Sequence, residues 1–138
     1  MSLKEEERNI IVSMEMEKAE QTFAESDVLK NAGLWSNLAN RLYYALFHAV
    51  SAMLIHDRRE VGTHRGVVLR FQQYYVKTGI FTTEDGAFYS QMQSLREKAD
   101  YNCYFDVVKA DILPRIEPTR QLIDKIKHYI TETDYNIV

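Results

Sequence analysis

A chain of 138 residues, 46% of them hydrophobic and 27% charged, suits a single globular domain over residues 1–138. Five glycines and two prolines are too few for the many turns of an all-β or α/β fold, so the composition favours an all-α protein. The net charge of −3 restricts any nucleic-acid contact to a local basic patch, the lone Cys103 excludes an intramolecular disulfide, and no apolar run approaches the ~18 residues that span a bilayer.

The first eight residues are polar and acidic, unlike a signal peptide, so we expect a cytoplasmic protein without a membrane span. Beyond them, Val12, Met16, Ala19 and Phe23 recur at helical spacing and predict a helix over about residues 4–31, with Gly33 as its stop. A second helix is predicted over about residues 35–56. Its inner face carries small and aliphatic residues that allow a neighbouring helix to approach closely: Leu38, Leu42, Ala45, Ala49 and Ala52.

Threonines mark the starts of the next two helices. Thr63 is a suitable N-cap for a third helix that ends at Gly79, and residues 58–62 form the loop before it. Thr82 or Thr83 caps a fourth helix. The apolar stripe of this fourth helix consists of Phe88, Met92, Leu95 and Ala99.

An aromatic-rich connection over residues 101–108 leads to the last helix. The isoleucines of that helix follow a near-heptad seam: Ile112, Ile116, Ile123, Ile126 and Ile130. Pro114 is compatible only with a position near its start, and Pro118 is expected to kink it. The elements together predict an up-and-down bundle of four to five helices, without internal repeats or linkers.

Two of the predicted helices carry a polar stripe beside their apolar one. The stripe of the second helix consists of Asn37, Arg41, Tyr44 and His48, and that of the fourth helix consists of Gln93, Arg96 and Asp100. Steps of three and four residues place each set on one helical face. Because long polar side chains are costly in a core unless they are paired, we expect the two stripes to meet each other or to face a cleft.

Each stripe allows a structural and a functional interpretation. Arg41, Tyr44 and His48 either form a buried polar network that fixes helix register, or line a cleft where arginine holds a phosphate and tyrosine or histidine handles a proton. Arg96 either forms an intrahelical ion pair with Asp100, in the weaker orientation for such a pair, or takes a partner across the helices such as Tyr44 or His48.

A basic segment leads into the third helix. Residues 56–70 contain four arginines and two histidines against only Asp57 and Glu60. The segment is either a solvated loop and helix start, or a place where His64 and Arg65 contact a nucleotide or RNA phosphate, because the amides of a helix N-terminus favour anions.

Other site types lack the residue spacing that they need. Steps of eight between His48, His56 and His64 do not place two histidines on one face of a helix, and no metal-binding motif occurs, so we expect neither a metal nor a cofactor. Cys103 has no histidine near it in sequence, which argues against a nucleophilic role. The chain also lacks a P-loop and a GxGxxG motif, so it has no recognisable nucleotide-phosphate cradle of its own.

Three segments, in this order and spacing, resemble the HEPN-domain family: RLYYALFHA over residues 41–49, THRGVV over residues 63–68 and LREKADY over residues 95–101. With the long last helix, the resemblance covers about residues 10–132 and is closest to small stand-alone bacterial and archaeal members. It implies a helical bundle that is usually a homodimer. Many such proteins are encoded beside a minimal nucleotidyltransferase, often as toxin with antitoxin, and others are metal-independent endoribonucleases.

Those enzymes carry an arginine and, after a gap of four to six residues, a histidine, both in a cleft at the dimer interface. Arg96 matches the arginine, whereas Tyr101 stands at the histidine position and no histidine follows at Asn102 or Cys103. Tyrosine has an ordinary pKa near 10 and is a poor base at neutral pH. The family's histidine is therefore missing from its place in this chain.

The resemblance implies a dimeric module that binds nucleotide or RNA, with a minimal nucleotidyltransferase as its partner. The alternative is a metal-independent ribonuclease toxin in which Arg96 stabilises the phosphate beside Asp100 and Tyr101, and His48 or His64 replaces the missing histidine. A purely structural dimer is the third interpretation.

Overall fold

The computed structural model of the chain describes residues 4–133, and within this range it contains helices and turns but no strand. The elements in chain order are α1 (Glu5–Asn31), α2 (Trp35–His56), α3 (His64–Phe71), the π-helical turn η1 (Gln72–Val76), α4 (Thr83–Tyr101), α5 (Lys109–Ile112), the 3₁₀ turn η2 (Leu113–Arg115) and α6 (Ile116–Glu132). This arrangement confirms the all-α helical bundle predicted from the sequence.

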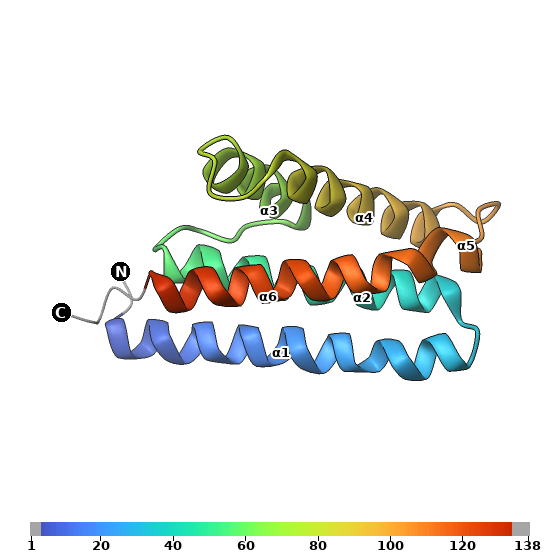
Figure 1. The fold of residues 1–138 in the computed structure, drawn as a ribbon, viewed down its shortest axis with the longest axis horizontal. Helices are drawn as coiled ribbons and strands as arrows, with labels where there is room; N and C mark the ends of the chain where they lie inside the picture. The colour runs from blue at the N-terminus through green and yellow to red at the C-terminus, as the bar shows by residue number, and fades with distance from the viewer. Residues whose placement is uncertain (1–3, 134–138) are drawn as a thin grey trace.

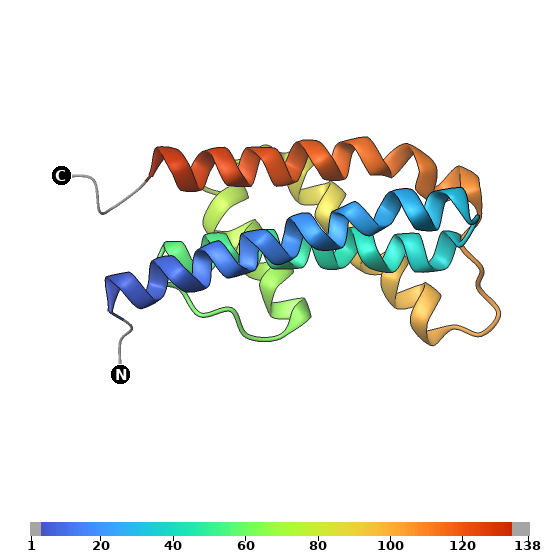
Figure 2. The same cartoon turned by 90° about the horizontal axis from the view of Figure 1, so that it is seen from below.

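The long helices lie side by side with α2 at the centre. Helix α1 lies along one side of α2, and α4 with the short α3 forms a layer on the opposite side, while α6 lies across the front of α2 (Figure 1). Helices α2 and α6 run opposite to α1 and α4, as the view turned by 90° also shows (Figure 2). The layer of α3 and α4 therefore faces α2 along the segment that carries the RLYYALFHA motif.

Helix α2 is the most buried element because almost every side of it meets another helix. The side chains of Leu42, Leu46 and Met53 are fully buried, and so are the alanines of its inner face. Small alanines allow helices to pack closely, and burying each aliphatic side chain contributes about 1.5–3 kcal/mol. Helix α2 therefore forms the centre of the hydrophobic core.

The predicted capping residues fix the starts of α3 and α4. The Thr63 hydroxyl accepts a hydrogen bond from the amide of Gly66 at 3.0 Å. Thr82 and Asp85 form a reciprocal capping box, in which each side chain accepts a hydrogen bond from the other residue's backbone amide. Such caps each contribute about 1 kcal/mol. The cap at Thr63 also sets the position of His64, the first residue of α3.

The π-helical turn η1, which follows α3, lies in close contact with α4 at Gly86. A Cβ atom at Gly86 would lie 2.3 Å from Oε1 of the Gln72 side chain and 3.0 Å from a methyl carbon of Val76, so η1 and α4 are in close contact here. The Gln72 side-chain amide donates a hydrogen bond to the Gly86 carbonyl at 2.7 Å. The predicted third helix thus continues past Phe71 as a π-helical turn, before Gly79 adopts a positive φ of 82°.

The last predicted helix differs from expectation at its start. Ile112 belongs to the separate short helix α5, and the 3₁₀ turn η2 contains Pro114. Helix α6 begins only at Ile116, so Pro118 lies in its first turn, where an amide has no intrahelical acceptor to lose. The irregularity therefore falls before Pro118, and α6 is assigned as one continuous helix from Ile116 to Glu132.

Candidate functional site

An aromatic and cationic cluster lies where α2 meets α3 and α4, and Tyr44 is at its centre. The guanidinium carbon of Arg41 lies 5.3 Å from the Tyr44 ring centroid, and that of Arg96 lies 5.7 Å from it. The His64 ring stands perpendicular to the Tyr44 ring at a centroid distance of 5.4 Å. Three elements thus place two arginines and a histidine around one tyrosine, which is partly exposed.

Tyr43, the neighbour of Tyr44, is buried beneath the same cluster. The Arg96 guanidinium lies 4.9 Å from its ring centroid, and the Tyr43 hydroxyl lies 3.3 Å from Nδ1 of His64. Burial raises the pKa of Tyr43 to about 12, so its hydroxyl stays protonated at neutral pH. The hydroxyl can therefore donate a hydrogen bond to Nδ1, which would leave the His64 proton on Nε2.

His64 is enclosed by aromatic rings and lies near positive charge. Its ring centroid is 4.4 Å from that of Phe47. The pKa of His64 is lowered, first by burial and then by the positive charges of Arg96 and His48. A lowered pKa keeps the imidazole neutral at pH 7, which is the form that can accept a proton.

Arg96 is almost completely buried, with an exposed fraction of 6%. Its Nη1 donates a hydrogen bond to the Asp100 carboxylate at 3.2 Å, and its Nε is buried without a hydrogen-bond partner among residues 4–133. Both interpretations of Arg96 are therefore realised, because it pairs with Asp100 within α4 and contacts Tyr44 across the helices. The Tyr101 ring centroid lies 5.9 Å from the same guanidinium.

Tyr101 is 79% exposed at the end of α4, and Tyr104 in the following connection is 96% exposed. The residue at the position of the family's histidine is thus a solvent-exposed ring beside a buried arginine.

The structure does not bring His48 into contact with Arg96. Nδ1 of His48 lies 3.0 Å from the Glu15 carboxylate on α1, and no hydrogen bond or ring contact within residues 4–133 joins it to Arg96. Arg41 also reaches towards α1, where its Nη1 lies 3.7 Å from the Glu25 carboxylate. Of the two histidines proposed to replace the missing one, His64 is the one in the cluster around Arg96.

A cavity of about 460 Å³ lies beside the cluster, between the ends of α1, α2 and α4. Arg41 and Asp100 both line it, together with Asn37 and Asn40. The Arg41 guanidinium donates hydrogen bonds to the Asn40 side-chain oxygen, the shorter at 2.6 Å. The polar stripe residues Arg41 and Asp100 therefore meet at one opening, next to the buried Arg96.

The basic segment over residues 56–70 is engaged within the protein. Arg58 pairs with the Glu5 carboxylate, Arg59 lies 3.8 Å from the Tyr74 ring centroid, and Arg70 donates a hydrogen bond to a backbone carbonyl. Exposed Arg65 pairs with the Glu97 carboxylate on α4 at 3.3 Å. This segment is therefore less available to phosphate than its composition alone indicates.

Two members of the cluster, Tyr43 and Phe47, were not singled out by the sequence analysis. Both fit the apolar face of α2, so their spacing resembled ordinary core residues. The one available signal was the hydroxyl of Tyr43, which is a polar group at a core position and requires a partner.

Two general properties concern the described residues 4–133. No group of three or more histidine, cysteine or acidic side chains is arranged there to hold a metal ion. None of the helices described is both long enough and apolar enough to cross a membrane.

Comparison with known proteins gives a consistent result. The HEPN domain matches residues 12–129. The UPF0332 protein of Thermotoga maritima is 34% identical over 76% of this chain and 79% of its own, and that of Archaeoglobus fulgidus is 26% identical over 88% of this chain and 96% of its own. A Methanocaldococcus jannaschii protein named as a candidate toxin is 25% identical over 83% of this chain and 78% of its own. With most of its length matched, the chain belongs to the HEPN-domain family.

Proposed function

We propose that this protein is a cytoplasmic, homodimeric HEPN module that binds RNA or nucleotide phosphate through Arg96 and the surrounding cluster. The observation that carries the proposal is the convergence of Arg96 and His64 on the rings of Tyr43 and Tyr44. A guanidinium supplies charge-assisted hydrogen bonds to phosphate, and the exposed ring of Tyr101 offers a face on which a base can stack.

Access to Arg96 requires a local rearrangement. Its guanidinium is buried, and Asp100 occupies one of its donors at 3.2 Å. Asp100 is partly exposed, and the adjacent Tyr101 ring is exposed at the surface beside the Arg96 guanidinium. A phosphate would therefore replace the Asp100 carboxylate, with Tyr101 moving aside, while Tyr43 and Tyr44 hold the guanidinium from the other side.

Dimerisation through the end of α4 is part of this proposal. Tyr101, Tyr104 and Val108 are all exposed apolar or aromatic side chains in this region, with exposed fractions of 79%, 96% and 52%. Aromatic residues are enriched in protein interfaces. A second copy packed here would bring two Arg96 clusters together into one cleft.

The partner in this proposal is a minimal nucleotidyltransferase. Support comes from the family to which the chain belongs and from the relative named as a candidate toxin. In that arrangement the HEPN module is the toxin or an accessory subunit. Co-expression with the neighbouring nucleotidyltransferase gene, where one exists, followed by affinity purification would test the association.

A second candidate function is metal-independent RNA cleavage, and the position of His64 favours it. The neutral imidazole could accept the proton of a ribose 2′-hydroxyl, while Arg96 stabilises the negative charge that develops on the phosphate. Such a reaction requires no metal, so chelator would leave it unchanged.

One experiment separates these functions. Purified protein is mixed with fluorescently labelled single-stranded RNA in the presence of chelator, and both anisotropy and cleavage products are followed. Binding without cleavage supports the module, and cleavage that is lost in His64→Gln supports the ribonuclease. Arg96→Ala should abolish either result, whereas the exposed control Lys77→Ala should preserve it. If the wild-type protein neither binds nor cleaves the RNA, both proposed functions are refuted.

A further inference from the structure

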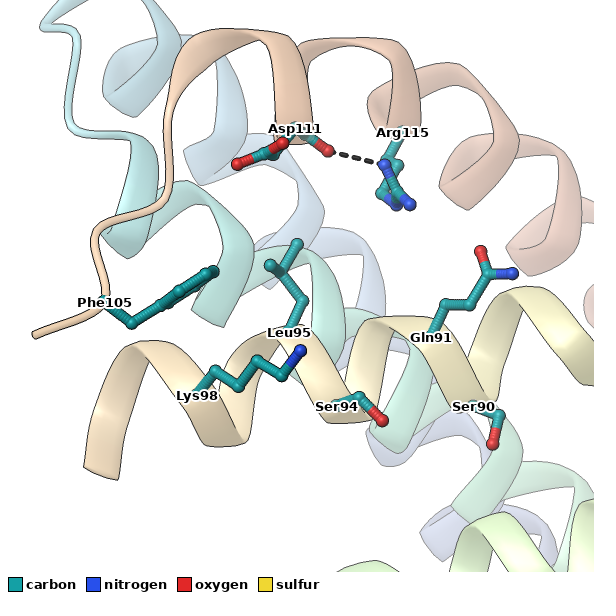
Figure 3. Close-up of a pocket in the computed structure, with 8 residues that line it drawn as sticks. All are labelled: Ser90, Gln91, Ser94, Leu95, Lys98, Phe105, Asp111 and Arg115. Atoms are coloured by element: carbon teal, nitrogen blue, oxygen red, sulfur yellow. Dashed lines mark hydrogen bonds between the residues drawn. The ribbon is translucent and has the colours of Figure 1, made fainter. Parts of the chain in front are cut away.

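A second cavity lies on the face of α4 that points away from the Arg96 cluster. It has a volume of about 460 Å³ and separates α4 from α5 and η2. Lys98, Ser94 and Gln91 line it from α4, and Arg115 lines it from the opposite wall (Figure 3). Steps of three and four residues place the α4 residues on one face, roughly opposite to Arg96.

The two cations of this cavity are not neutralised by the protein. Neither Lys98 nor Arg115 forms an ion pair with a carboxylate among residues 4–133, whereas Arg41, Arg65 and Arg96 each do. The ammonium group of Lys98 lies 5.9 Å from the Phe105 ring centroid. A pair of positive side chains on opposite walls thus remains available to a negatively charged ligand.

Arg115 is held in place by the backbone. Its Nη1 donates a hydrogen bond to the Asp111 carbonyl at 2.6 Å, drawn as a dashed line in Figure 3. Its Nε is buried and lacks a hydrogen-bond partner within residues 4–133. Fixing one end of a guanidinium by a short backbone contact reduces the entropy that is lost when the other end binds a ligand.

Asp111 contributes the one carboxylate of the cavity wall. That carboxylate accepts a hydrogen bond from the backbone amide of Val108 at 3.4 Å. It lies on the side of Asp111 away from the Arg115 guanidinium (Figure 3). The lining therefore carries two cations, Lys98 and Arg115, against one carboxylate, so its charged groups are positive on balance.

The lining combines charge, neutral donors and an apolar side. The Gln91 amide points from α4 towards Arg115, Ser94 adds a hydroxyl to the lining, and Leu95 and Phe105 form an apolar wall (Figure 3). Two cations with additional donors fit the three oxygens of a phosphate monoester better than the planar carboxylate group. The apolar wall fits a ring or hydrocarbon group attached to that phosphate.

We propose that this cavity binds a small molecule in which a phosphate monoester is joined to an apolar or aromatic group. Lys98 and Arg115 clamp the phosphate, and Phe105 with Leu95 contacts the attached group. This site is separate from the Arg96 cluster, and the proposal does not depend on RNA binding or cleavage there.

The test uses AMP as the probe, with inorganic phosphate and adenosine as its two halves, in isothermal titration calorimetry on the full chain. AMP should bind more tightly than either half. Lys98→Gln and Arg115→Gln should each weaken AMP binding at least about tenfold, because each removes a charge-assisted contact. Lys109→Gln, which removes an exposed charge outside the cavity lining, should change the affinity by less than about twofold.

Further readouts keep the result decisive. If Arg115→Gln disturbs folding, Arg115→Lys is measured in its place. This variant keeps the positive charge and should therefore keep most of the AMP affinity. Lys98→Gln should leave RNA affinity within about twofold, since it lies outside the Arg96 cluster. The proposal is overturned if AMP does not bind at millimolar concentration, if adenosine binds as tightly as AMP, or if the Lys98 and Lys109 variants behave alike.

Discussion

The Tyr43 hydroxyl lies 3.3 Å from Nδ1 of His64, and this contact joins the buried centre of α2 to the first residue of α3. Because Tyr43 also carries the Arg96 guanidinium over its ring, at 4.9 Å, one side chain positions both groups of the candidate site. The contact should therefore affect both the free energy of unfolding and any RNA binding or cleavage at Arg96.

The first prediction concerns the pH dependence of stability. The pKa of His64 is lowered in the folded protein, mainly by burial, so the unfolded chain binds this proton more readily. The stabilisation is therefore fully present above the ordinary pKa of 6.5 and is lost as pH falls below it. Urea unfolding should show a larger loss of stability between pH 7.5 and 5.5 in the wild type than in His64→Gln. An equal loss in both proteins would contradict the burial of a neutral His64.

The second prediction tests whether Asp100 blocks Arg96. Asp100→Asn removes the carboxylate that occupies Nη1, and it removes a negative charge beside the proposed phosphate site. We expect RNA affinity, measured by anisotropy at low salt, to increase by about threefold or more. Glu84→Gln removes the same charge at the exposed other end of α4 and serves as the control. Equal effects in the two variants would mean that only net charge matters.

The third prediction concerns a polar connection that holds three elements together. The Asp57 carboxylate accepts hydrogen bonds from the hydroxyls of Tyr75 on η1 and Tyr129 on α6, at 2.6 and 2.7 Å. Asp57→Ala would leave both hydroxyls without this acceptor, at a cost of about 2–4 kcal/mol in the free energy of unfolding. Tyr129→Phe removes one bond and should cost about 1 kcal/mol. Chemical denaturation that gives equal losses would contradict the shared role of Asp57.

The sequence predicts those features of the fold that depend on local chemistry. Thr63 and Thr82 are capping residues in the structure as expected, and α1 and α2 begin and end close to the predicted limits. These features depend on residues a few positions apart, so periodicity and turn chemistry are sufficient to find them.

The site itself depends on how neighbours share a helical face. Arg41, Tyr44 and His48 do lie on one side of α2, but that side borders both α1 and α4. His48 therefore meets Glu15 on α1, whereas Tyr44, rotated by part of a turn, reaches Arg96. Spacing along the sequence predicts which face of its own helix a residue occupies. It does not predict which other helix packs against that face.

The position of His64 could not be predicted for a related reason. It depends on how α3 packs against α2, where the His64 ring contacts the rings of Tyr43, Tyr44 and Phe47. Contacts between residues distant in sequence leave no periodic pattern, so the histidine in the cluster could not be distinguished from His48 beforehand.

The last prediction concerns Tyr101, which stands at the position of the family's histidine. If the wild-type protein binds RNA without cleaving it, Tyr101→His should introduce cleavage in the presence of chelator. The new imidazole would lie about one turn and a fraction from Arg96, and its pKa near 6.5 suits proton transfer at neutral pH. Tyr101→Phe serves as the control, because it keeps the ring and adds no titrating group.

The Tyr101 variants also help to identify the residue that accepts the proton in any RNA cleavage by the wild-type protein. If the wild-type protein already cleaves RNA and Tyr101→Phe cleaves equally well, the proton acceptor lies elsewhere, and His64→Gln should then remove the activity. His48→Gln should retain it, because His48 faces Glu15 on α1. Gel analysis of products at a single RNA concentration compares the wild-type protein with these three variants. Cleavage that survives the loss of Arg96 and of both histidines would place the active site outside the Tyr43–Tyr44 cluster.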